Sequence, residues 1–201
     1  MDSDGYLSQL ADIFNGITVN TPSISAIIAI VLAGVLLLAS GFASASEIAF
    51  FSLTPSDRND IDEQNHPSDE KISALLGDSE RLLATILITN NFVNVTIIML
   101  CNFFFMNVFV FHSPLAEFLI LTVILTFLLL LFGEIMPKIY SAQKTLAFCR
   151  FSAPGIYFLE KLFRPVATVL VRSTTFLNKH FVKKSHNISV DELSHALELT
   201  D

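Results

Sequence analysis

The stretch from residue 82 to residue 137 most constrains this chain, because it contains no lysine or arginine. Its only carboxylates are Glu117 and Glu134. Across the whole chain 15% of residues are charged, against roughly 25% in soluble domains, and the mean hydropathy is +0.60. A soluble fold does not leave so long a segment uncharged, whereas the interior of a bilayer strongly disfavours charge. The charge distribution therefore predicts a membrane protein.

Three apolar runs account for this bias, at about residues 23–53, 82–111 and 115–137. Each is longer than the roughly 20 residues that a helix needs to cross a bilayer. They could alternatively be buried helices of a large soluble protein, but the 201 residues contain no partner sequence able to bury them. The predicted fold class is an all-α membrane protein with three long transmembrane helices.

The basic residues orient these spans. Residues 1–57 contain none, and the turn between the second and third spans has none nearby. Nine of the 12 basic residues follow the third span, beginning at Lys138, and the other three lie in the loop between the first two spans. The positive-inside rule then places the N-terminus outside and the C-terminus inside, which agrees with three crossings. The loop residues are Arg58, Lys71 and Arg81.

The chain divides into four parts on this reasoning. Residues 1–22 form an extracytoplasmic segment and residues 23–150 form the transmembrane module. Residues 151–185 alternate apolar and basic side chains at helical spacing, with a kink expected at Pro165. Such juxtamembrane amphipathic helices usually form a belt in the cytosolic membrane interface, although packing on a soluble domain is the alternative. Residues 186–201 are expected to begin a cytosolic helix leading to regulatory domains absent from this sequence.

Each span carries one cluster of polar residues. Spacing places the main members of the first two clusters on one helix face each. In the third, Pro137 lacks an N–H and leaves the carbonyl of Gly133 without its helical partner. At 1.5 Å per residue, all three clusters fall in the cytosolic half of the bilayer, which predicts one polar site. The clusters are Ser40, Ser44 and Glu47; Asn90, Asn91 and Asn94; and Gly133, Glu134, Pro137 and Lys138.

Hydroxyl, amide, carbonyl and carboxylate oxygens are hard ligands, and no histidine or cysteine accompanies them. This argues against zinc or copper and suits Mg²⁺, but Na⁺ or a proton could use the same groups. Structural roles are also open. The serines and asparagines can join helices, Glu134 can pair with Lys138 four residues later, and Glu47 can sit at the cytosolic interface. We expect Ser46, which lies off the shared face, to be structural.

All five histidines lie outside the spans, so the intramembrane residues lack the base or metal ligands of a hydrolase. We therefore expect no enzymatic activity. We also expect no nucleic-acid binding, because the basic helix after the third span has an apolar face better suited to lipid.

Three motifs resemble those of one family. "LASGFASASEIAFFSL", "LITNNFVN" and "LLFGEIMPK" resemble the "S-x-F-F-S-x-x-E-x-A-l", "LIGNNLVN" and "FGEIxPK" elements of the cyclin M and CorC/CorB magnesium transporters. These elements belong to the family's three-helix membrane module, the domain of unknown function 21. Their order and spacing match over about residues 20–185. Gly41, where a bulkier residue is common, and Thr89, where glycine is frequent, depart from the pattern.

The resemblance implies a homodimer of three-helix modules in the bacterial cytoplasmic (inner) membrane, each holding dehydrated Mg²⁺ in an inward-facing cavity. We expect a Mg²⁺ exporter in contact with membrane lipid, with Na⁺ entry as a coupling that stays open. ATP would bind only to cystathionine-β-synthase-type domains outside this sequence. The implied metal ligands are Ser40, Ser44, Asn90, Asn94, Gly133 and Glu134, with Glu47, Asn91, Pro137 and Lys138 as lining or support.

A second function stays open alongside transport. Some relatives in gliding bacteria are associated with motility or secretion machinery. The alternative is therefore a non-transporting membrane scaffold, or a Mg²⁺ sensor that signals to cytosolic domains.

Overall fold

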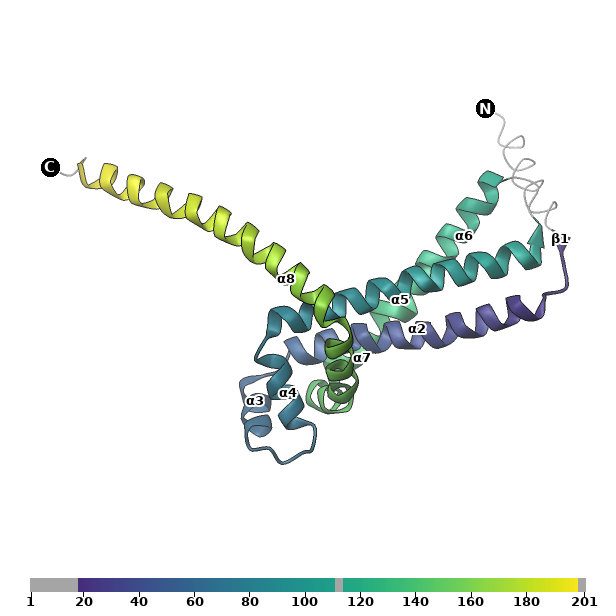
Figure 1. The fold of residues 1–201 in the computed structure, drawn as a ribbon, viewed down its shortest axis with the longest axis horizontal. Helices are drawn as coiled ribbons and strands as arrows, with labels where there is room; N and C mark the ends of the chain where they lie inside the picture. The colour runs from purple at the N-terminus through teal and green to yellow at the C-terminus, as the bar shows by residue number, and fades with distance from the viewer. Residues whose placement is uncertain (1–17, 111–113, 199–201) are drawn as a thin grey trace.

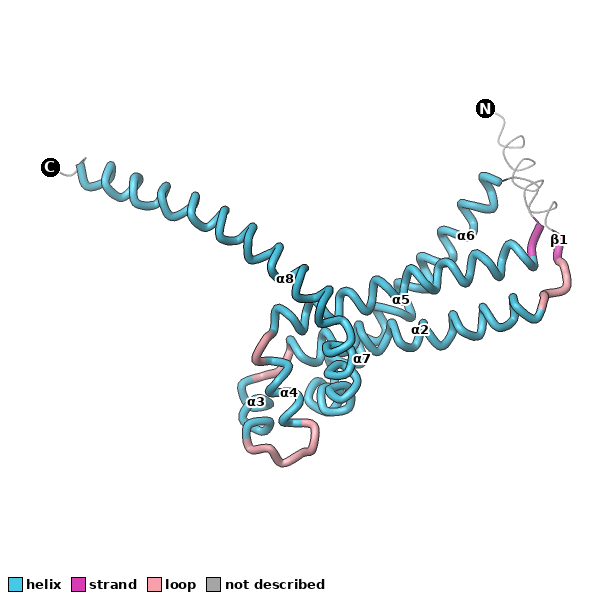
Figure 2. The backbone as a smooth tube through the Cα atoms, in the orientation of Figure 1, coloured by secondary structure: helices cyan, strands magenta, loops and turns pink. Residues whose placement is uncertain are grey.

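The computed structural model describes residues 18–110 and 114–198, and almost all of this backbone is helical (Figures 1 and 2). The loops in Figure 2 lie mainly before α2 and around α3 and α4. The elements in chain order are β1 Thr18–Val19, α2 Ile24–Phe51, α3 Pro55–Asp62, α4 Asp69–Leu76, α5 Ser79–Val108, β2 Phe109–Val110, α6 Pro114–Leu128, the π-helix η1 Leu129–Ile135, α7 Met136–Gln143 and α8 Thr145–Glu198.

Three helices are long and apolar enough to cross a membrane, and they confirm the predicted all-α membrane fold. They are Ile24–Phe51, Ser79–Val108 and Glu117–Gln143, and the last, here called the third span, joins most of α6 to η1 and α7. Large apolar side chains cover their outer surfaces; Leu38 is 76% exposed and Met106 is 69% exposed. Lipid or a partner protein must cover such surfaces, because water would strongly disfavour them.

The helices α2 and α5 lie side by side and antiparallel (Figure 1). Their contact is mainly apolar, and Ala33 of α2 packs with Val93 and Ile97 of α5 and with Leu125 of α6. The small side chains of α2 allow this close approach. Ala26, Ala29 and Ala33 recur at helical spacing and are all buried.

A two-residue antiparallel ladder departs from the purely helical prediction. Thr18 pairs with Val110 and Val19 with Phe109, so β1 and β2 join the chain just before α2 to the chain just after α5. The antiparallel packing of the two helices brings these extended segments together. The backbone N–H of Asn20 also donates to the Val108 carbonyl (2.7 Å). Residues 1–17 of the predicted N-terminal segment lie outside the described residues.

The loop between the first two spans folds into the short helices α3 and α4, which the sequence analysis did not identify. Thr54 begins α3 with a reciprocal capping box, in which its hydroxyl accepts from the Asp57 N–H and the Asp57 carboxylate accepts from the Thr54 N–H. Apolar side chains then bury both helices against the adjacent ends of α2, α5 and α8. This core comprises Ala49, Phe50, Leu53, Ile61, Ile72, Leu75, Leu82, Ile86, Cys149, Ala153 and Ile156.

The helix α8 is continuous across both predicted boundaries, at residues 151 and 186, although it contains Pro154 and Pro165. Each proline removes one backbone hydrogen bond, and a long helix tolerates this as a bend. Figure 1 shows the first part of α8 packed across the ends of α2 and α5, and the rest running away as a long arm. The location of this arm relative to a membrane stays a prediction.

Candidate cation site

The polar contact between α2 and α5 centres on Ser40, which is fully buried. Its Oγ lies 2.8 Å from Oδ1 of Asn90 and 2.7 Å from Oδ1 of Asn94. One hydroxyl carries only one hydrogen, so in this arrangement one of the two amide oxygens is left for another donor or for a cation. The two asparagines are four residues apart and therefore lie on the same face of α5. The structure thus brings together three of the predicted ligands.

The third span meets this group at its π-helical turn. A Cβ atom added to Gly133 would lie 3.1 Å from Ser40 Oγ, so glycine allows the backbone to approach the hydroxyl. At the end of η1, the Met136 N–H donates to the Leu131 carbonyl, five residues earlier. Proline follows at position 137 and has no N–H to continue the pattern. Single π-helical turns inside α-helices are frequent at functional sites.

Two further contacts fix the third span parallel to α2. A Cβ atom on Gly41 would lie 3.0 Å from Pro137 Cγ and 3.3 Å from the Phe132 carbonyl oxygen, so a bulkier residue would collide here. This gives the departure at Gly41 a packing reason. One turn further, the buried Ser141 hydroxyl donates to the Ala45 carbonyl (2.6 Å). Ser141 is a site residue that the sequence analysis missed, although it follows Pro137 by four residues and so lies on its face.

Ser44 lies one turn beyond Ser40 on α2, and its hydroxyl is fully buried without a hydrogen-bond partner among the described residues. Leaving such a group unpaired costs about 1–3 kcal/mol, which a bound ligand could recover. Glu134 is partly exposed and, within the described part of the chain, its carboxylate makes no hydrogen bond or ion pair. No measured contact joins either residue to Ser40, so their place in a shared site stays a prediction.

The charged residues pair differently from the local alternative considered above. Lys138 Nζ lies 3.1 Å from Glu47 Oε2 on α2, and both side chains are about one-third exposed. The alternative Glu134–Lys138 pair is not formed among the described residues. Asn91 is exposed, and its side chain makes no hydrogen bond among the described residues. Ser46 donates to the Phe42 carbonyl of its own helix (2.7 Å), a bond that suits the structural role expected of it.

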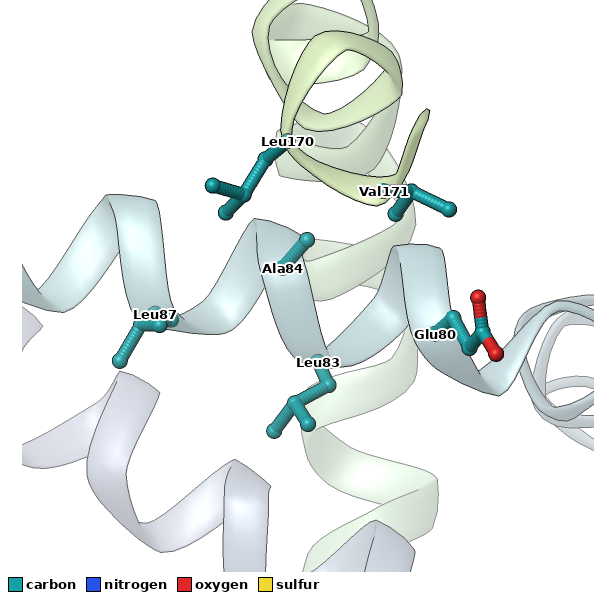
Figure 3. Close-up of a pocket in the computed structure, with 6 residues that line it drawn as sticks. All are labelled: Glu80, Leu83, Ala84, Leu87, Leu170 and Val171. Atoms are coloured by element: carbon teal, nitrogen blue, oxygen red, sulfur yellow. The ribbon is translucent and has the colours of Figure 1, made fainter. Parts of the chain in front are cut away.

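Two cavities along these helices are lined mainly by apolar side chains. One of about 300 Å³ lies behind Gly41 and Pro137, with mainly aromatic walls that include Phe42, Phe132 and Phe148. Another, of about 220 Å³, lies between α5 and α8. It is lined by Leu83, Ala84 and Leu87 of α5 and by Leu170 and Val171 of α8, with Glu80 at one end (Figure 3). Neither cavity offers the several oxygen atoms that a cation requires.

Carboxylates, histidines and cysteines alone do not form a metal site in the described part of the chain, where no group of three of them comes together. A cation bound there would have to use hydroxyl, amide or carbonyl oxygens. The cluster of Ser40, Asn90 and Asn94 beside Gly133 supplies these atoms.

Two comparisons relate this chain to known proteins. The profile of the family described as "Cyclin M transmembrane N-terminal domain" matches residues 30–201. A UPF0053 protein of Haemophilus influenzae is 31% identical over 134 residues, which cover 67% of this chain. The match covers 31% of that relative, so this chain spans only a part of the relative's length.

Proposed function

Because the chain belongs to the cyclin M transmembrane domain family, which is generally linked to divalent cation transport, we propose that it is the membrane module of a Mg²⁺ transporter. The family membership and the three apolar helices make it a membrane protein. The proposal adds that the site faces the cytosol and that Mg²⁺ moves outward, with Na⁺ entry as the candidate coupling. It also adds that the module works as a homodimer in the bacterial cytoplasmic membrane.

One observation carries this proposal: the Ser40 hydroxyl lies between two asparagine amides of α5 and against Gly133 of the π-helical turn. Three spans therefore meet at one place inside the bundle. Two of them contribute oxygen-bearing side chains, and the third contributes the backbone of Gly133, which has no side chain. Mg²⁺ prefers oxygen ligands in octahedral geometry at about 2.0–2.1 Å. The hydroxyls of Ser40 and Ser44, the two amide oxygens, the Gly133 carbonyl and the Glu134 carboxylate offer ligands of this type.

A carboxylate in the site favours a divalent ion. An unpaired charge within a span costs at least about 2.5–3.5 kcal/mol, and a cation beside it offsets that cost. Na⁺ could use the same oxygens, so selectivity must be measured rather than inferred from ligand type.

The experiment is Mg²⁺ flux by the full chain in proteoliposomes, comparing Asn90→Ala with Asn102→Ala. Asn102 is exposed on the same helix, three turns away, and serves as the matched control. We expect Asn90→Ala to lower flux about tenfold or more, because it removes one ligand; a tenfold loss corresponds to about 1.4 kcal/mol of binding free energy. Asn102→Ala should retain wild-type flux. Undiminished flux in Asn90→Ala and Glu134→Ala proteins that remain folded would exclude this site.

The long arm of α8 favours a second candidate function. It leaves the bundle as a continuous helix (Figure 1) and so offers a rigid link to whatever follows or binds it. A Mg²⁺ sensor or scaffold would bind the ion without moving it. Saturable Mg²⁺ binding measured by calorimetry, together with no flux in proteoliposomes, would favour this function over transport.

A further inference from the structure

Lys138 has one carboxylate four residues before it on its own span and another on α2, and it pairs with the one on α2. Its Nζ lies 3.1 Å from Glu47 on α2. Glu134 lies four residues before Lys138 on the same span and has no partner among the described residues. A glutamate four residues before a lysine is the favourable order for an ion pair within a helix. In the structure Lys138 therefore pairs with Glu47, which is distant in the sequence, and the nearby Glu134 stays unpaired among the described residues.

The packing of α2 against the third span sets the positions of these charges. Gly133 meets Ser40, and Ser141 meets Ala45, so the two parallel spans advance together. Glu134 directly follows Gly133 and lies near the level of Ser40. Lys138 lies about one turn further along, or about 6 Å at 1.5 Å per residue. The Glu47–Lys138 pair is thus adjacent to the candidate cation site but not part of it.

We propose that Glu47 is a positioning residue that holds Lys138 away from Glu134, and that Lys138 competes with the transported cation for Glu134 when it is released. This inference rests on the proposed function and names a regulation of the same site. With Lys138 bound to Glu47, the Glu134 carboxylate is available to Mg²⁺. With Lys138 turned toward Glu134, the ammonium group neutralises the carboxylate.

Such an exchange would keep the carboxylate of the site paired when no cation is bound. After the cation leaves, Glu134 would be an unpaired charge within a span, which is unfavourable. A tethered ammonium group one turn away could replace the lost cation without entering from solution. Coulomb attraction at this distance is stronger in the span than in water, because the effective dielectric constant is lower.

The test measures the apparent Mg²⁺ affinity of purified full-chain protein from the midpoint of its Mg²⁺-dependent thermal stabilisation. The variants are Glu47→Gln, Lys138→Gln and the double variant, with Glu80→Gln as a control for general loss of negative charge. Glu80 is exposed near the N-terminal end of α5. We expect Glu47→Gln to weaken Mg²⁺ about tenfold, one step on the scale of 1.4 kcal/mol per decade. Lys138→Gln should bind at least as tightly as the wild type.

Rescue of Mg²⁺ affinity in the double variant distinguishes this positioning role from a structural role of Glu47 and from direct attraction of the cation by Glu47. The double variant should match Lys138→Gln, because no ammonium group remains to compete. If the double variant stays as weak as Glu47→Gln, Glu47 attracts or binds the cation itself and the proposal is wrong. Unchanged affinity in Glu47→Gln, or an equal loss in Glu80→Gln, would also overturn it. Should Glu47→Gln fail to fold, a Lys138→Gln protein with weaker binding than wild type would contradict the proposal.

The same data separate this inference from the proposed function. A wild-type protein without any Mg²⁺ response would contradict both. A wild-type response with no effect of Glu47→Gln would contradict only the role of Lys138. Mg²⁺ flux in proteoliposomes for the same four variants gives an independent reading, in which Glu47→Gln alone should require more Mg²⁺ for half-maximal rate.

Discussion

The ion pair between Asp69 and Arg150 joins the loop helix α4 to α8, and its removal should be among the most damaging changes outside the spans. Arg150 Nε lies 2.8 Å from Asp69 Oδ1, and its second nitrogen lies 3.0 Å from Oδ2. The carboxylate is fully buried and also accepts from the His66 backbone N–H (3.0 Å), while the arginine side chain is 24% exposed. The perturbation is Arg150→Met, which keeps an unbranched apolar chain and removes the charge.

The size of the stability loss follows from the Asp69 charge, which Arg150→Met leaves buried without its partner. Removing one partner of a buried pair costs about 3–5 kcal/mol, because the remaining charge stays buried without compensation. For a chain of this size, each kcal/mol corresponds to about 2–4 °C in Tm, so we expect a loss of roughly 6–20 °C. Lys144→Met is the control. Lys144 is exposed near the start of α8, and its replacement should change the free energy of unfolding by less than about 0.5 kcal/mol.

The direction in which the stability changes with pH follows from the pKa of Asp69. Burial raises the pKa of the Asp69 carboxyl, but the hydrogen bonds from Arg150 and His66 and the Arg150 charge lower it further, so the pKa lies below its ordinary value. The wild-type pair is therefore stabilising above the unfolded pKa of about 3.9 and loses its effect as pH falls through the lower folded pKa. In Arg150→Met burial dominates, the pKa rises, and stability falls as pH rises. The difference between the two proteins should be largest near neutral pH and shrink toward pH 4.

Thermal unfolding in detergent, followed by far-ultraviolet circular dichroism at several pH values, measures this difference. The double variant Asp69→Asn, Arg150→Met should recover most of the loss, because no buried charge remains. Two results would refute the reasoning: a loss in Arg150→Met no greater than in Lys144→Met, or a loss that is independent of pH and persists in the double variant.

Two further predictions follow from close packing. Gly41→Leu should destabilise the protein by about 1–3 kcal/mol and remove its stabilisation by Mg²⁺, because the new side chain collides with Pro137 beside the site. The control is Gly34→Leu, since a Cβ atom at Gly34 meets nothing within 4 Å. In the same thermal assay this variant should show neither effect. Burial raises the pKa of Cys149 to about 12, so iodoacetamide at pH 8 should leave Cys149 unmodified in the folded protein and label it after denaturation, as read by peptide mass spectrometry. Equal labelling rates in both states would contradict the second prediction.

The spans and the central polar contact could be predicted from sequence because each depends on a strong local rule. Exclusion of charge from the bilayer determines where the spans lie, and helical spacing places Asn90 and Asn94 on one face. Their contact with Ser40 then required only that the three polar clusters have similar depths. Pro137 indicated a disturbance of the third span, although the sequence did not show that it takes the form of a π-helical turn.

The features that sequence reasoning missed depend on residues far apart in the chain. The helices α3 and α4 are short and gain their stability from the core around Phe50 and from the Asp69–Arg150 pair, whose members are 81 positions apart. The partner of Lys138 was missed for a similar reason. A local rule favours Glu134, but parallel packing of two spans brings Glu47 closer, and no pattern within either span records that proximity.

The ladder of β1 and β2 has a mechanical consequence for the bundle. It ties α2 to α5 at one end, and the core of α3, α4 and α8 ties the same two helices at the other. This pair therefore forms a frame whose members cannot slide or spread without breaking one of the ties. The third span shares neither tie and is the least buried of the three, with 17% of its most apolar window buried against 33% and 39%. Side-chain contacts with α2 hold the third span instead, so a change in its packing would leave both ties intact.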